Sequence, residues 1–273
     1  LYRVKSASGS ILTLYRCSMA YFLESMLHLY RVKIEPLALS FDSPCEALDA
    51  KLAQWGLHPQ VRAEELGCRP AVGAPRTTRT KRLYACIQIP RKMHTSFDAV
   101  LLGVLRQDPS AVLLLEGRVK QFLPRWTRAG MTPHDLQHRL VLLPRLAHPE
   151  YLQLLSLASV FLNTFPFGAG ITSSEALSVC VPVVVYAEMS SVLHLALAQV
   201  RKLGARWARE WIAHSTEEYV RRAVAVATIP QEAERQYRGA ICEAREQLLG
   251  RANLEEVTRE WDGFLKRIWQ AWM

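Results

Sequence analysis

The sequence lacks closely paired cysteines, although it contains six. They are scattered without any CxxC spacing, at Cys17, Cys45, Cys68, Cys86, Cys180 and Cys242. Structural zinc sites and dithiol redox centres use such close pairs, so the pattern argues against both. We therefore expect reduced thiols, which are typical of a cytoplasmic or nucleocytoplasmic protein.

A long apolar run is also missing. The nearest candidate, residues 11–30, is interrupted by Arg16 and Glu24, whereas a membrane helix needs about twenty apolar residues. We predict no membrane span. No signal peptide of normal build is present, and because the chain begins at Leu1 rather than Met, its targeting is left open.

Acidic residues are in the minority, 25 against 34 lysines and arginines, which gives a net charge of +9. This charge suits nucleic acid, an anionic surface or a phosphate-bearing ligand without choosing among them. A nucleic-acid site needs basic residues on one face with aromatic platforms. The basic run at 75–82 is instead typical of a linker, so we expect no nucleic-acid partner.

Residues 1–80 show no regular pattern. LYRVK occurs at 1–5 and again at 29–33, but the spacing of such fragments is unequal, which excludes a solenoid. The segment CRPAVGAPRTTRTKR, residues 68–82, predicts a solvated linker. We expect residues 1–80 to be an incomplete or divergent N-terminal region that ends in this linker.

From residue 81 to 250, short apolar runs alternate with segments of helical spacing. The predicted strands are 83–89, 111–117, 139–144, 160–165 and 181–187, and the predicted helices are 96–107, 119–130, 149–158, 173–180 and 191–204. Continuous apolar strands that alternate with helices indicate a parallel sheet covered on both faces. The fold class is therefore α/β, a doubly wound, Rossmann-like domain. Residues 251–273 predict a C-terminal helix whose tryptophans, Trp261, Trp269 and Trp272, dock on the core.

The stretch NTFPFGAGITSSE, residues 163–175, follows one of these strands. Its glycines allow backbone amides to approach an anion, and its hydroxyl residues are of the type that caps a helix. A diphosphate fits such a loop, but on local residues alone a plain turn capped by serine is favoured. A dinucleotide-binding GxGxxG motif is a third interpretation, with Glu188 as the ribose acid. Ser173 occupies the place of its third glycine, which disfavours it.

Several motifs in the same order resemble the C-terminal catalytic half of the O-GlcNAc transferase-like and SPINDLY-like glycosyltransferases. They are YACIQIPRKMHTSFDAVLLGVLRQDPSAVLLL, LPRLAHPEYLQLLSLASVFLNTFPFGAGITSSEALSVCVPVVVY, LALAQVRKLG and STEEYVRRAVAVA, within residues 83–250. The resemblance implies a GT-B architecture and the metal-independent transfer of a sugar from a nucleotide donor to a protein side chain. It implies no cofactor. The donor would be UDP-GlcNAc-like, UDP-glucose or GDP-fucose.

The resemblance also implies which residues hold the donor. Lys92 and Gln88 would contact the diphosphate, as would Gly170, Thr172 and Ser173. Glu175 would bind the ribose, and His148 and Tyr151 would flank the base. Each also has a structural interpretation, such as a helix cap for His148 or a first-turn acid for Glu175.

The chain departs from the family at His194, where many relatives carry arginine, and at Ile171 and Cys180. The first Rossmann domain, which holds the family's acceptor surface and proposed base, has no match here. We therefore assign no catalytic residue and expect a fragment. The alternatives to a glycosyltransferase are a noncatalytic nucleotide-sugar-binding or interaction module and, less favoured, a nucleic-acid-associated protein or an NAD enzyme.

Overall fold

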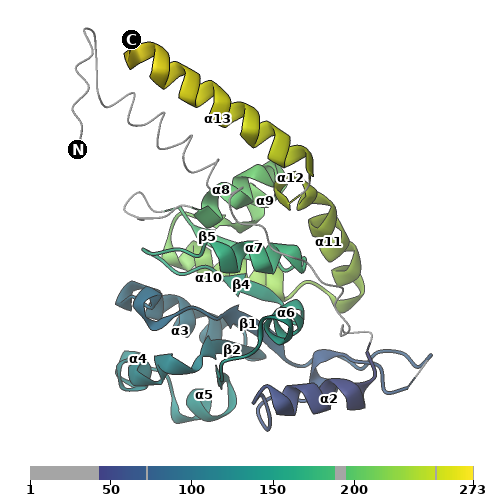
Figure 1. Cartoon of the computed structure of the whole chain (residues 1–273). Helices are drawn as coiled ribbons and strands as arrows, with labels where there is room; N and C mark the ends of the chain where they lie inside the picture. Colours follow the sequence, from purple (N-terminus) through teal and green to yellow (C-terminus); the bar gives the residue numbers. More distant parts are fainter. Residues whose placement is uncertain (1–42, 72, 188–194, 250, 273) are drawn as a thin grey trace.

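The computed structural model describes residues 43–71, 73–187, 195–249 and 251–272. Its centre is a parallel sheet of six strands in the order β3-β2-β1-β4-β5-β6 (Figure 1). The strands are β1 (Arg82–Cys86), β2 (Ala111–Glu116), β3 (Leu140–Leu143), β4 (Val160–Leu162), β5 (Val183–Tyr186) and β6 (Ile212–Ala213). This order reverses direction between β1 and β4 and is that of a Rossmann-like, doubly wound fold. The predicted fold class is confirmed.

The helices follow the strands as the alternating pattern predicts. They are α3 (Asp98–Gln107), α4 (Leu123–Ala129), α5 (Pro133–His138), α6 (His148–Ser156), α7 (Ile171–Ser178), α8 (Leu195–Lys202), α9 (Ala205–Trp211), α10 (Thr216–Ala227), α11 (Gln231–Ala244), α12 (Glu246–Leu249) and α13 (Arg251–Trp272). The short segments η2 (Pro90–Lys92), η3 (Thr95–Phe97) and η4 (Gly117–Phe122) are 3-10 turns. None of the described helices is both long and apolar enough to cross a membrane.

Alternate side chains of the strands supply two separate cores. Tyr84 and Leu113 belong to the core that contains α3 and α10, whereas Leu83, Val112 and Val141 belong to the core on the other face. Successive residues of a strand point to opposite faces, which explains this division. Because both faces are covered, the strands are mostly apolar, with Arg82 and Glu116 at the ends of β1 and β2.

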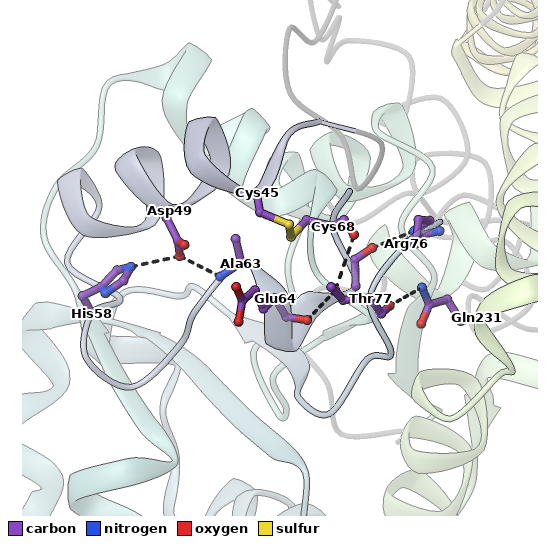
Figure 2. Close-up of a disulfide and its surroundings, with 10 residues drawn as sticks. Cys45, Asp49, His58, Ala63, Glu64, Cys68, Arg76, Thr77 and Gln231 are labelled. Carbon is purple, nitrogen blue, oxygen red and sulfur yellow. Dashed lines mark hydrogen bonds and ion pairs between the residues drawn. A yellow bond between two sulfur atoms is a disulfide. The ribbon is translucent and has the colours of Figure 1, made fainter. Parts of the chain in front are cut away.

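The segment before β1 forms much of the second layer. Helix α2 (Cys45–Gln54) and the chain that follows it bury Leu48, Leu52 and Trp55 against the β1–β3 half of the sheet. Figure 2 shows the disulfide between Cys45 and Cys68 that closes this segment. Residues 43–71 are therefore packed on the Rossmann-like domain.

The expectation of a solvated linker at 68–82 is wrong. Arg79 makes a two-pronged ion pair with Glu234 of α11, with N–O distances of 2.6 and 3.2 Å, and its side chain is only 8% exposed. Its backbone amide donates to Gln231, whose side-chain amide donates back to Thr77 O. The prolines and basic residues of this segment predict solvent exposure, but tertiary ion pairing and hydrogen bonds fix it against α11.

The expectation of reduced thiols is also wrong for four cysteines. Besides Cys45–Cys68, a disulfide joins Cys180 to Cys242, with Cα–Cα distances of 5.2 and 5.1 Å. The partners are 23 and 62 residues apart in sequence, so only the fold brings them together. Cys86 is a free, buried thiol whose pKa is raised by burial. Cys17 lies outside the described residues.

The C-terminal helix α13 extends away from the sheet (Figure 1). Trp269 and Trp272 are exposed, the latter by 84%, so the expectation that they dock on the core is wrong. Trp261 is partly buried and lies edge-on to Phe264 of the same helix. The aromatic pattern predicted an apolar face, but no described element of the chain covers Trp269 or Trp272.

Glu234 joins three parts of the chain. Its carboxylate pairs with Arg79 and with Arg238, which in turn donates to the carbonyl oxygens of Ser156 and Ala158. Burial alone would raise the pKa of Glu234, but the guanidinium groups of Arg238 and Arg79 outweigh burial and lower it below 4.5.

Substitution Glu234→Gln should destabilise the fold by about 3 kcal/mol, because two buried guanidinium groups lose their counter-charge. The lowered pKa means that the carboxylate contributes fully above pH 4.5, and that this contribution is lost as pH falls through the folded-state value. Urea unfolding at pH 7 and at pH 3 measures both effects. Glu232→Gln on the exposed side of α11 is the control; an equal loss there, or a loss that does not shrink at pH 3, would contradict the prediction.

Candidate functional site

The candidate site lies where the strand order reverses, between β1 and β4. The chain leaves β1 toward Gln88 and Lys92, and it leaves β4 into the loop 163–170 that leads to α7. β1 and β4 are adjacent and parallel, with Tyr84 opposite Val160, so their carboxyl ends lie at the same edge of the sheet. Ligands of open α/β sheets bind in the crevice at such a reversal.

Gln88 links the two sides of this crevice. Its side chain is 2% exposed, and its Nε2 atom donates to Thr172 Oγ1 over 2.8 Å. Thr172 lies in the first turn of α7 and is partly buried. The hydrogen bond therefore fixes the chain after β1 to the start of α7, 84 residues later.

Lys92 is the cation of the site. It ends the turn η2 and is half-buried, and its Nζ atom lies 5.1 Å from the ring centroid of Phe167, a residue of the loop after β4. Burial lowers the pKa of Lys92. Among the described residues no carboxylate pairs with it, so its charge faces the loop without a neutralising partner.

The loop after β4 is shaped by its own hydrogen bonds. Asn163 Oδ1 accepts from the amide of Ala169 over 2.5 Å, and Thr164 Oγ1 donates to Phe167 O over 2.8 Å. These bonds turn the chain back so that Gly170 stands directly before α7 as its N-cap.

Gly170 leaves the start of α7 open. The first amides of any helix have no intrahelical acceptor, and here the N-cap supplies no side chain to satisfy them. A Cβ atom at Gly170 would lie 2.9 Å from Leu195 Cδ1, so a larger residue there would require the Leu195 side chain to shift. The amides of residues 171–173 are therefore available to an anion, which the helix dipole favours.

The carbonyl oxygen of Gly170 accepts hydrogen bonds from three side chains. It accepts from Ser173 Oγ over 2.8 Å, from Ser174 Oγ over 3.3 Å and from Gln199 Nε2 over 3.2 Å. Gln199 also donates to Ser174 Oγ over 2.6 Å. The Ser173 hydroxyl, predicted to meet the diphosphate, is thus engaged inside the loop, and Ser173 can offer a ligand only its amide.

A second group lies between α6 and α7. His148 Nε2 and Glu175 Oε1 are 2.9 Å apart, and the rings of His148 and Tyr151 stack at 6.4 Å between centroids. Glu175 is buried, while the His148 side chain is half exposed. Burial and then the Glu175 carboxylate raise the pKa of Tyr151, whose hydroxyl makes no hydrogen bond among the described residues.

The structure thus gathers all eight predicted residues at one sheet edge, in two groups joined by α7. One group is Gln88, Lys92, Gly170, Thr172 and Ser173, and the other is His148, Tyr151 and Glu175. Among the other residues singled out, Ile171 is exposed and Cys180 is bonded to Cys242. Glu188 and His194 lie outside the described residues. His58 pairs with Asp49 in the N-terminal segment.

Sequence reasoning missed Asn163, Phe167 and Gln199. Gln199 had a detectable signal, since it is a lone polar residue in the apolar run LALAQV and is 3% exposed. A buried polar group must find partners. Within the described parts of the chain, no three histidine, cysteine, aspartate or glutamate residues form a group that could hold a metal ion.

Comparison with protein-family models and with curated proteins gave no match to the sequence. Among solved structures, the chain is similar to a variant of Thermobaculum terrenum O-GlcNAc transferase, with a TM-score of 0.61 and 19% identity over 71% of this chain and 37% of that one. Anabaena HepE in complex with UDP gives a TM-score of 0.46 and 16% identity, over 69% of this chain and 49% of that one. WaaG, a glycosyltransferase involved in lipopolysaccharide biosynthesis, gives 0.44 and 15%, over 67% and 46%.

The first of these likenesses shows the fold, the Rossmann-like α/β domain found in GT-B glycosyltransferases. The chain spans less than half the length of each of the three structures.

Substitution Gln199→Leu should loosen the loop before α7, because Gly170 O and Ser174 Oγ both lose a donor. We expect a stability loss of about 1–3 kcal/mol and faster hydrogen exchange of the Ser174 amide, which donates to Gly170 O. Exchange measured by mass spectrometry checks this. Arg201→Gln, on the exposed side of the same helix, should leave exchange in the loop unchanged. Equal hydrogen exchange in Gln199→Leu and Arg201→Gln would show that Gln199 does not hold the loop in place.

Proposed function

We propose that this chain is the donor-binding part of a metal-independent glycosyltransferase, which transfers a sugar from a nucleoside diphosphate to a protein side chain. The observation that carries the proposal is that Lys92 Nζ lies 5.1 Å from the ring centroid of Phe167, in the loop that leads to the uncapped start of α7 at the strand reversal. A half-buried ammonium and several free amides aimed at one crevice are what a diphosphate requires.

The chemistry of transfer gives these groups a role beyond binding. As the bond from sugar to diphosphate breaks, negative charge grows on the departing phosphate oxygens. Lys92 and the amides of residues 171–173 would stabilise that charge in the place where other enzymes use a metal ion. Thr172 Oγ1 would donate its proton to a phosphate oxygen while accepting from Gln88, so the hydroxyl is already oriented.

The second group would hold the nucleoside. Glu175 would accept from the ribose hydroxyls, with His148 setting the direction of its carboxylate, and His148 and Tyr151 would flank the base. With the phosphates at the start of α7 and the ribose at Glu175, one turn later, the nucleoside would lie along α7 on the side of α6. The similarity in fold to an O-GlcNAc transferase supports a UDP-GlcNAc-like donor, with UDP-glucose and GDP-fucose as the alternatives.

A noncatalytic nucleotide-sugar-binding module is the second candidate. It is favoured by the pairing of His148, the histidine within the described site, with Glu175, which leaves it poorly placed to take a proton from an acceptor. The acceptor protein or peptide and the catalytic base belong to the proposal and have no assigned residues in this chain.

The oxidation state of the cysteines indicates the cellular compartment. A cytoplasmic or nucleocytoplasmic protein was expected from the scattered thiols, whereas Cys45–Cys68 and Cys180–Cys242 favour an oxidising compartment. We propose the latter; thiol counting on the protein as isolated under alkylating conditions distinguishes the two.

UDP should bind the chain equally well with magnesium and with EDTA, and Lys92→Ala should weaken binding about 10- to 100-fold, the value of one charge-assisted hydrogen bond of about 1.5–3 kcal/mol. Isothermal calorimetry measures both. Lys266→Ala, which removes an equal charge from an exposed position on α13, is the control. Binding that needs magnesium, or that ignores Lys92, would refute the proposed site.

Substitution Glu175→Gln should distinguish the contribution of the ribose to binding from that of the phosphates. Because Glu175 would contact only the nucleoside, this variant should bind UDP about 10-fold more weakly, which corresponds to about 1.4 kcal/mol, but should bind inorganic diphosphate normally. Lys92→Ala should lose both ligands. Competition calorimetry on variants with matched melting temperatures gives the comparison. Equal losses of UDP and diphosphate in Glu175→Gln would show that Glu175 acts on the loop rather than on the ribose.

A further inference from the structure

An apolar stripe runs along the last turns of α13. Leu265, Ile268, Trp269 and Trp272 occupy positions i, i+3, i+4 and i+7, which share one face of a helix. Their side chains are between 47% and 84% exposed, and no described element of the chain covers them. Single exposed apolar residues are common on protein surfaces, but four large ones in one stripe indicate a surface that is used for binding.

The stripe lies at the far end of a helix whose start is held by the domain. Lys202 of α8 pairs with Glu256, in the second turn of α13, with an N–O distance of 3.2 Å. At the rise of an α-helix, Trp272 lies about 24 Å further along the axis. Figure 1 shows this part of α13 extending away from the sheet. The stripe is therefore accessible to a broad surface.

The other charged positions of this segment are basic. Residues 263–272 contain Lys266 and Arg267 and no acidic residue. A Cβ atom added at Gly263 would lie 3.6 Å from Arg267 Nη1, so the guanidinium group lies beside the glycine, on the side of the helix away from the stripe. Lys266 pairs with Asp262 over 2.7 Å, but both side chains are exposed, and such pairs are weak.

This arrangement is typical of a helix that lies in a membrane interface. Such helices have tryptophan and leucine on the apolar face and lysine or arginine on the polar face. Tryptophan suits this position because its ring is largely apolar while its indole N–H finds a polar partner.

The charge of the whole chain favours an anionic lipid surface over a second copy of the chain. A net charge of +9 attracts the chain to negative headgroups from a distance. A second copy would bring an equal positive charge, so long-range electrostatics opposes self-association through this face.

We propose that the end of α13 binds the surface of an anionic lipid bilayer, with the helix parallel to the membrane and its apolar stripe inserted at the level of the headgroups. Lys266 and Arg267 would remain at the level of the lipid phosphates. The helix lies on the membrane and does not cross it, since none of the described helices is long and apolar enough to do so. The proposal does not depend on the donor site.

Flotation of the full chain with lipid vesicles tests this. Vesicles of equal parts phosphatidylglycerol and phosphatidylcholine should bind the chain about 10-fold more tightly than vesicles of phosphatidylcholine alone, and added salt should reduce the difference. The double substitution Trp269→Ala and Trp272→Ala should weaken binding to the mixed vesicles about 10-fold or more, because much of the inserted apolar area is lost. Gln270→Ala, on the exposed polar side of the same segment, should have no effect.

Both tryptophans are exposed, so the double variant should keep the melting temperature of the unchanged chain. Mixed vesicles that bind the double variant as tightly as the unchanged chain would overturn the proposal, as would equal binding to both kinds of vesicle. Sedimentation that shows a dimer, lost in the double variant, would also overturn it, since the stripe would then be covered by a second copy. UDP binding without vesicles should be the same in the double variant, so the failure of either proposal leaves the other testable.

Discussion

The parallel pairing of β1 with β4 is the constraint on which the rest of the architecture depends. The sheet extends from this pair in opposite directions, so right-handed crossovers place α3, after β1, and α7, after β4, on opposite faces of the sheet. The carboxyl ends of both strands are left between the helix layers. Gln88 and Thr172 meet there because of that pairing.

The same winding separates two kinds of cationic environment. At the carboxyl edge, one lysine and the amides of a helix start provide positive potential with few fixed charges. At the amino edge, arginines are paired with carboxylates, Arg82 with Asp108 and Arg79 with Glu234. The first arrangement suits a charge that develops during a reaction, since it needs no bulky side chain near the reacting atoms.

The order of strands and helices could be predicted because fully buried strands are apolar at every position and stand out from amphipathic helices. The edge at which Lys92, Thr172 and Glu175 gather also follows from this pattern. The direction of each hydroxyl could not be predicted, since Ser173 and Thr172 are adjacent and similar, yet Ser173 donates to Gly170 O whereas Thr172 accepts from Gln88. Nor could the burial of Arg79, whose carboxylate partner is 155 residues away. In each case the missing information was a contact between distant segments, which composition and periodicity do not contain.

The bond between Cys180 and Cys242 closes a ring of chain that includes α8, α9, β6, α10 and most of α11. A protease that cuts once anywhere inside this ring would not release a fragment, because the two pieces stay covalently joined. The end of α7 and the end of α11 would remain tethered, and with them the loop whose amides form the candidate donor site. Limited proteolysis would therefore yield a nicked protein of unchanged mass, apart from the added water, until a reductant separates it.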